Sequence, residues 1–80
     1  MTQLQEAFLY ELKSQAKFTV AEYATLYIKY HSLAVEEEKS KGAGERQAKN
    51  MAEYYTLSVL SDFIGNENTM ARIIALYKSA

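Results

Sequence analysis

The positions of the residues that interrupt helices constrain this chain more than any other feature. The chain contains no proline, and its glycines are Gly42, Gly44 and Gly65. Because Gly and Pro are the strongest local breaks in a helix, the segments between these positions are free to form long helices. No segment alternates apolar and polar residues for long enough to indicate a strand. The sequence therefore predicts an all-α fold, which we assign to a single domain over residues 1–80.

Apolar periodicity and capping residues predict four helices, at approximately residues 2–15, 20–39, 45–64 and 69–79. Thr19 and Glu22 have the spacing of a capping box, and Phe18 before them can pack on the first turn. Gly65 suits the left-handed residue that follows a helix, and we expect Gly42 or Gly44 to have a positive φ. The short turn after residue 39 makes the second and third helices a central antiparallel hairpin, against which the outer helices pack.

The predicted helix at residues 20–39 is unusually apolar. At about 100° per residue its polar side chains form one stripe roughly 80° wide, which comprises Glu22, Thr25, Lys29, Ser32 and Glu36. A helix that is apolar on most sides must be covered on most sides. Two interpretations remain open. The helix is the centre of a monomeric bundle, or part of its surface is a protein interface. The residues that we assign to such an interface are Tyr23, Leu26, Tyr27, Lys29, Tyr30 and His31.

The small size of the chain favours the interface. A domain of 80 residues buries only roughly 60–65% of the surface that its unfolded form exposes. Such small cores usually need additional stabilisation. The chain contains no cysteine, so neither a disulfide nor a thiolate metal site can supply it. Association with a second copy is the remaining common solution, and we expect a homodimer.

The seven tyrosines of the chain suggest an alternative function. Aromatic side chains can line a cavity that stacks a nucleotide or another small planar ligand. No glycine-rich phosphate loop or ordered basic stripe accompanies these tyrosines, however. Their helical spacing favours residues at the edge of an apolar core, with tyrosine also common at protein interfaces.

No residue pattern indicates catalysis or metal binding. His31 is the only histidine, and no H-E-x-x-H or E-x-x-H spacing surrounds it. It lies opposite the polar stripe of its helix, so we expect a buried or interfacial histidine with a lowered pKa. Nucleotide-binding and common hydrolase motifs are also missing. We therefore expect a protein that is not an enzyme and binds neither a cofactor nor a metal.

The predicted hairpin tip carries a cluster of basic residues, which gives a second alternative function. Lys39, Lys41, Arg46 and Lys49 could contact the phosphates of a nucleic acid if the turn gathers them on one side. The formal net charge of −1 argues against this function, because nucleic-acid binders generally carry a basic excess. The acidic run at residues 36–38 also precedes the cluster.

The remaining expectations concern location and role. The first residues lack the basic and apolar regions of a secretory signal, and no apolar stretch approaches the ~20 residues that span a bilayer. We therefore expect a cytoplasmic protein with no membrane partner. The function that the sequence favours is a small interaction module, a regulator or inhibitor that binds an unidentified partner protein, as a homodimer.

Overall fold

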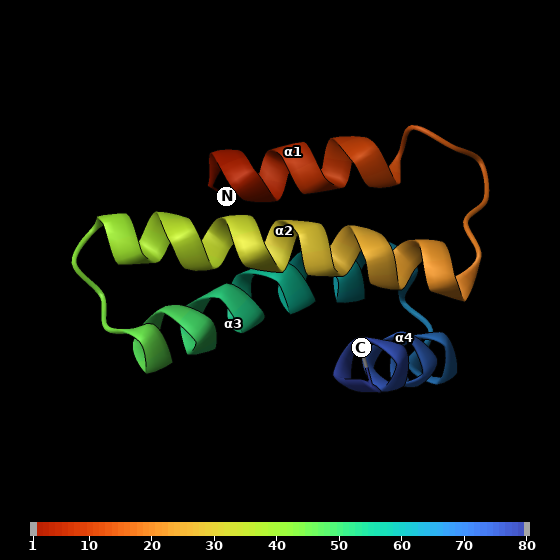
Figure 1. The fold of residues 1–80 in the computed structure, drawn as a ribbon. Helices are drawn as coiled ribbons and strands as arrows, with labels where there is room; N and C mark the ends of the chain where they lie inside the picture. Colours follow the sequence, from red (N-terminus) through yellow and green to blue (C-terminus); the bar gives the residue numbers. More distant parts are fainter. Residues whose placement is uncertain (1, 80) are drawn as a thin grey trace.

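The computed structural model describes residues 2–79 and confirms the all-α fold. This part of the chain forms four helices and no strand. The helices are α1 (Gln3–Leu12), α2 (Val20–Ser40), α3 (Glu45–Ile64) and α4 (Glu67–Ser79). In Figure 1, α2 and α3 form the predicted antiparallel hairpin, with α1 on one side of it and α4 on the other.

The start of α2 is built as the sequence predicts. The Thr19 hydroxyl accepts the Glu22 backbone N–H at 3.1 Å, and the Glu22 carboxylate accepts the Thr19 N–H at 2.9 Å. Phe18 packs on Tyr23, with ring centroids 5.1 Å apart. These contacts satisfy backbone donors at the helix end and determine the direction in which the chain enters α2. A second capping box, of Thr2 and Gln5, starts α1 and was not predicted.

The hairpin turn and the end of α3 use glycine for its conformational freedom. Gly42 has a φ of 99° and Gly65 a φ of 64°, both in the left-handed region that other residues rarely adopt. Gly44 instead has a φ of −68° and is the N-cap of α3. The expected positive φ in the turn is therefore confirmed at Gly42, and the predicted end of the helix at Gly65 is confirmed as well.

Two predicted boundaries differ from the structure by two or three residues. The first helix ends at Leu12 rather than at residue 15, because no buried side chain follows Leu12 until the half-buried Phe18. The Ser14 hydroxyl also donates to the Glu11 carbonyl oxygen at 2.6 Å, which closes the last turn. The fourth helix begins at Glu67 rather than at residue 69, because the Asn66 side chain accepts the Thr69 N–H at 3.0 Å.

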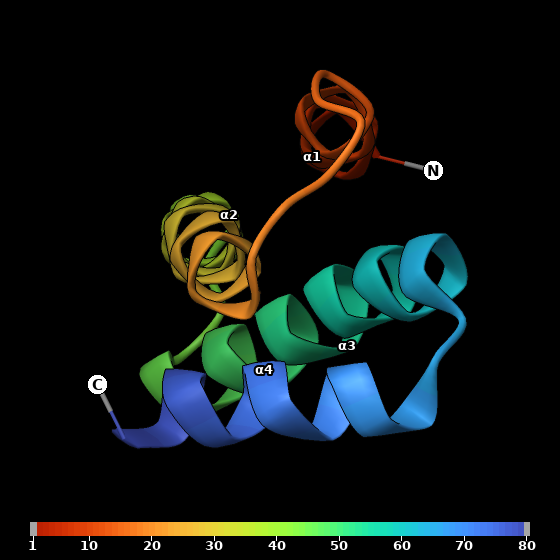
Figure 2. The same cartoon turned by 90° about the vertical axis from the view of Figure 1, so that its right-hand side faces the viewer.

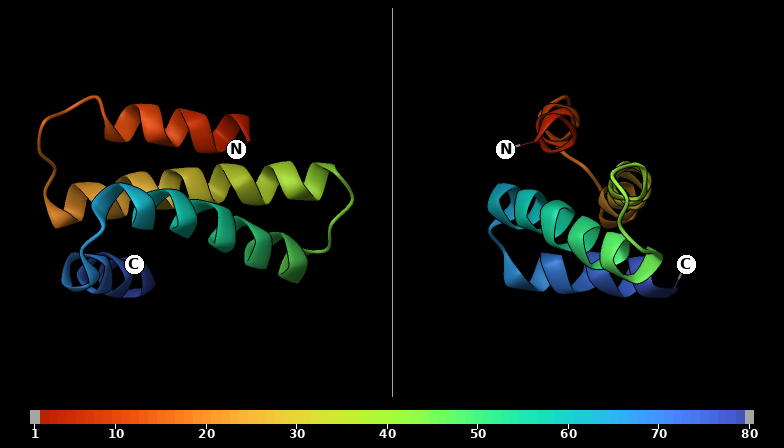
Figure 3. Two further views of the ribbon diagram at one scale, coloured as in Figure 1. Left: turned by 180° about the vertical axis from the view of Figure 1, so that it is seen from behind. Right: turned by 90° about the vertical axis from the view of Figure 1, so that its left-hand side faces the viewer.

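The outer helices cover the hairpin in different ways. Seen along α2 in Figure 2, α1 is also viewed nearly end-on, so these two helices run side by side, whereas α4 runs across them. The same view shows α3 close to α2 near the turn and farther from it towards the end of α3. Figure 3 shows from behind that α1 and α4 remain on opposite sides of the hairpin.

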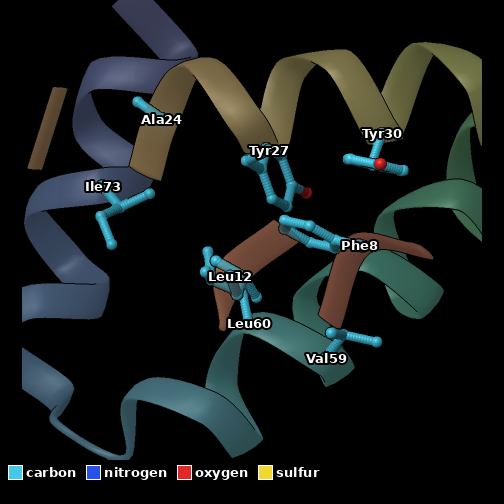
Figure 4. Close-up of a cluster of buried hydrophobic side chains, with 8 residues drawn as sticks. All are labelled: Phe8, Leu12, Ala24, Tyr27, Tyr30, Val59, Leu60 and Ile73. Atoms are coloured by element: carbon cyan, nitrogen blue, oxygen red, sulfur yellow. The ribbon is translucent and has the colours of Figure 1, made fainter. Parts of the chain in front are cut away.

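The hairpin has two parts with different cores. The aromatic half, which is covered by α1 and α4, buries large side chains from all four helices (Figure 4): Phe8, Leu12, Ala24, Tyr27, Tyr30, Val59, Leu60 and Ile73. The alanine half, nearer the turn, buries Ala34, Val35, Ala48 and Ala52. Small side chains allow the two helices of the alanine half to approach closely, whereas the space in the aromatic half is filled by rings.

Candidate interaction surface

Two of the predicted interface residues are part of the core of the chain. Tyr27 is 2% exposed and Tyr30 is 6% exposed, so neither can contact a partner on this fold. Phe8 of α1 stacks on Tyr30 with ring centroids 4.9 Å apart, and Tyr77 of α4 packs edge-on against Tyr27 at 4.6 Å. The structure therefore places Tyr27 and Tyr30 in the core, rather than on the surface where the sequence interpretation assigned them. Their rings are covered by the two outer helices rather than by another molecule.

Lys29 is exposed, as predicted, but it is joined to α1. One oxygen of Glu11, Oε2, accepts a hydrogen bond from Lys29 Nζ at 3.1 Å and another from the Tyr30 hydroxyl. These two hydrogen bonds, Tyr30 first, lower the pKa of Glu11. Burial, together with the bond to Glu11, raises the pKa of Tyr30 to about 12. Glu11 therefore holds α1 against α2, a role that no local pattern in the sequence indicated.

His31 is half-buried between two tyrosines. Its ring lies 5.8 Å from that of Tyr27 and 5.4 Å from that of Tyr77, measured between centroids. Burial lowers the pKa of His31, as expected from the sequence, although the nearby Glu53 carboxylate acts in the opposite direction. Among residues 2–79, no cluster of histidine and carboxylate side chains is arranged to hold a metal ion. This geometry suits a packing role for His31.

The Tyr27 hydroxyl is buried without a hydrogen-bond partner among the described residues. Burial raises the pKa of Tyr27 to about 12, and the neighbouring Thr56 hydroxyl only partly opposes that shift. Thr56 donates its own proton to the Ala52 carbonyl oxygen at 2.7 Å. An unpaired buried hydroxyl destabilises a fold, so Tyr27 contributes through its ring rather than through its oxygen.

The tyrosines do not surround a cavity that a planar ligand would fill. Tyr30 and Tyr55 line a cavity between α1 and the hairpin, whose volume of about 10 Å³ is close to that of a single water molecule. Tyr10 and Tyr54 are among the most exposed large hydrophobic side chains, and the ring of Tyr54 lies edge-on to that of Tyr55. Pockets that hold drug-sized ligands are typically about 300–1,000 Å³.

The hairpin tip is not a basic patch. Lys39, Lys41, Arg46 and Lys49 are all exposed there, as predicted. Two of the four lie beside carboxylates, however: Lys41 Nζ is 3.8 Å from oxygens of Glu37 and Glu38, and Lys49 Nζ is 3.5 Å from Glu45. Residues 36–49 carry four acidic and four basic side chains. A tip with no net charge lacks the electrostatic attraction that phosphate binding requires.

The outer face of α2 is the part of this helix that the other helices leave accessible. In Figure 2, α1, α3 and α4 all lie on one side of α2, and the opposite side is free. The whole predicted polar stripe is exposed there, which confirms its orientation. Leu33, at the edge of the stripe, remains 43% exposed. An apolar side chain among polar neighbours is therefore available on this face.

A groove opens beside the first turns of α2. Its volume is about 330 Å³, and it is lined by Gln15, Phe18, Ala21, Glu22, Thr25 and Leu26. Leu26 is the one predicted interface residue that contributes to it, whereas Tyr23 packs beneath it on Phe18. The sequence pattern did not single out Gln15 or Phe18 as binding residues, because they lie in the connection between helices and outside any periodic stripe.

Among residues 2–79, none of the helices combines the length with the apolar character that is needed to cross a bilayer. Comparisons with protein families, with curated proteins and with solved structures find no match for this chain.

Proposed function

We propose that this protein is a small interaction module without enzymatic activity, a regulator or inhibitor that acts by binding protein, and that it pairs with a second copy. The binding surface is the outer face of α2 together with the groove at its start. We place the protein in the cytoplasm, a proposal that is consistent with the absence of cysteine.

One observation carries the proposal: an exposed leucine side chain and an apolar groove occur on the same face of one helix. Leu33 is 43% exposed, and the groove that contains Phe18 and Leu26 is open to solvent. Burying a fully exposed leucine stabilises by about 1.5–3 kcal/mol, so covering the exposed 43% of Leu33 in both copies stabilises a dimer by about 1–3 kcal/mol. In a chain with so small a core, this gain is large compared with the free energy of unfolding.

Sedimentation equilibrium from low micromolar to millimolar concentration tests the proposal. The wild-type chain should approach twice its 9.1 kDa mass as concentration rises. Leu33→Asp should weaken this association at least about tenfold, because a carboxylate replaces an apolar contact in each copy.

The matched control is Leu76→Asp on α4. Leu76 has the same exposed fraction as Leu33, 43%, but lies on another helix, so its substitution should leave association unchanged. Circular dichroism confirms that both variants fold. A wild-type chain that stays monomeric at millimolar concentration would overturn the proposal. So would a Leu76→Asp variant that dissociates while Leu33→Asp remains dimeric.

A further inference from the structure

We infer that the second copy docks antiparallel on the outer face of α2, with Leu33 of each copy seated in the groove of the other. This inference rests on the proposed function and adds to it the register of the interface. The groove runs from the residues before α2 up to Thr25 and Leu26, and Leu33 lies beyond them along the helix. A two-fold axis between Thr25 and Leu26 makes the contact twice, as an isologous interface requires.

The spacing of the residues on this face selects the register. Phe18 and Leu33 are equally far in sequence from the midpoint between Thr25 and Leu26, and so are Glu22 and Lys29. In an antiparallel pair with its axis at this midpoint, each residue faces its counterpart at the same height. Glu22 of one copy therefore meets Lys29 of the other, and Leu33 of one lies level with the residues just before α2 of the other, where Phe18 lines the groove. At the axis, Thr25 of each copy lies level with Leu26 of the other.

The charges favour a two-fold axis between Thr25 and Leu26 over an axis at Lys29. An axis at Lys29 would place the two lysines against each other and Glu22 against Glu36, so that like charges would meet. With the axis between Thr25 and Leu26, every charge of the Glu22–Lys29 pair faces its opposite.

Both residues of the pair have unused bonding capacity. The Glu22 oxygen Oε1 accepts the Thr19 N–H, and its second oxygen has no hydrogen bond within residues 2–79. Lys29 Nζ uses one donor for Glu11 at 3.1 Å, and an ammonium group has three. Lys29 can therefore bridge Glu11 of its own copy and Glu22 of the other, without giving up the contact that holds α1.

Disulfide trapping tests the register, because the chain has no cysteine of its own. Thr25→Cys places a thiol next to the axis, where two copies should cross-link under mild oxidation. Glu36→Cys lies on the same exposed stripe, but its two thiols would be about 30 Å apart at 1.5 Å of rise per residue. We expect a cross-linked dimer from Thr25→Cys and none from Glu36→Cys.

The ion pairs are tested with Glu22→Gln. Glutamine retains the capping box, as Gln5 does at the start of α1, but removes the charge from both copies. The Kd of the dimer should rise about 2- to 30-fold, the range expected for two exposed ion pairs. Glu67→Gln removes the same charge from the first turn of α4, outside the outer face of α2, and should leave the Kd unchanged.

The outcomes separate this inference from the proposed function. If the wild-type chain dimerises but Thr25→Cys fails to cross-link, or Glu36→Cys cross-links equally well, the register is wrong and the association stands. The register is equally wrong if Glu22→Gln and Glu67→Gln weaken the dimer to the same extent. If no dimer forms at any concentration, both proposals fail together.

Discussion

The two halves of the α2–α3 hairpin fill the space between the helices differently, one with small side chains and the other with large ones. In the alanine half, Ala48 and Ala52 are fully buried although only Leu4 and Ala43 pack against the cluster from outside. In the aromatic half, the helices are farther apart, and the space needs side chains from α1 and α4. Small residues bring two helices together with only Leu4 of α1 packed above them, whereas the large residues require side chains from both α1 and α4. The volume of the side chains thus determines where this small fold needs its outer helices.

The aromatic half should be the more sensitive to loss of volume. Leu60→Ala removes a fully buried side chain from the cluster that joins all four helices. We expect a loss of about 2–5 kcal/mol in the free energy of unfolding, since the surrounding side chains cannot close the cavity. Urea denaturation measures this loss, with the 43%-exposed Leu76→Ala as a control that should change far less. A loss below about 1 kcal/mol would mean that this half is loosely packed.

The alanine half should instead be sensitive to added volume. Ala52→Leu introduces three carbon atoms where the exposed fraction is zero and the helices are close. Overpacking of this kind typically costs about 1–3 kcal/mol. Ala75→Leu, at an exposed position on α4, is the control. If Ala52→Leu has the stability of the wild type, close approach is not what distinguishes the two halves.

Two tyrosines of the aromatic half should respond oppositely to loss of their hydroxyls. Tyr30→Phe removes the hydrogen bond to the Glu11 carboxylate and should cost about 1.5–3 kcal/mol. Tyr27→Phe removes an unpaired buried hydroxyl and should be neutral or stabilising by up to about 1 kcal/mol. Thermal unfolding of the two variants side by side compares them directly. Equal losses would indicate that the Tyr27 hydroxyl has a partner in solution.

The smallest effect concerns pH. Burial lowers the pKa of His31 in the folded chain, so between this value and about 6.5 the unfolded chain binds more protons. Stability from this residue is complete above pH ~6.5 and is lost as pH falls through that window. Denaturant titrations from pH 7.5 to 5.5 should show the decline, and His31→Gln should reduce its slope. An unchanged slope in this variant would mean that groups other than His31 cause the loss of stability at low pH.

The sequence predicted the parts of this fold that depend on neighbouring residues. The capping box at Thr19, the exposed stripe that contains Lys29 and the positive φ at Gly42 all follow from local geometry. The apolar character of α2 also indicated that other side chains must cover most of this helix. What covers Tyr27 and Tyr30 could not be deduced, because periodicity gives the direction of a side chain and not the element that it meets.

The candidate surface was predictable only in part. Leu26 and Lys29 were assigned to it from their place on the helix, and both lie on or beside the outer face. Phe18 and Gln15 join the groove only because the chain turns back after α1, which is a tertiary contact. Glu11 was missed for the same reason, since its partners Lys29 and Tyr30 are on another helix.

The way in which α4 is attached has a consequence for how the molecule opens. Ile73 is its one fully buried side chain, and most of its contacts are with α2 rather than with α3. Proteins open in cooperative units whose free energies follow the apolar contacts that hold them. We therefore expect α4 to detach as a unit while α1, α2 and α3 stay together, so that its amide hydrogens exchange with solvent ahead of those in the hairpin. Each such opening uncovers the part of the Tyr27 ring against which Tyr77 packs.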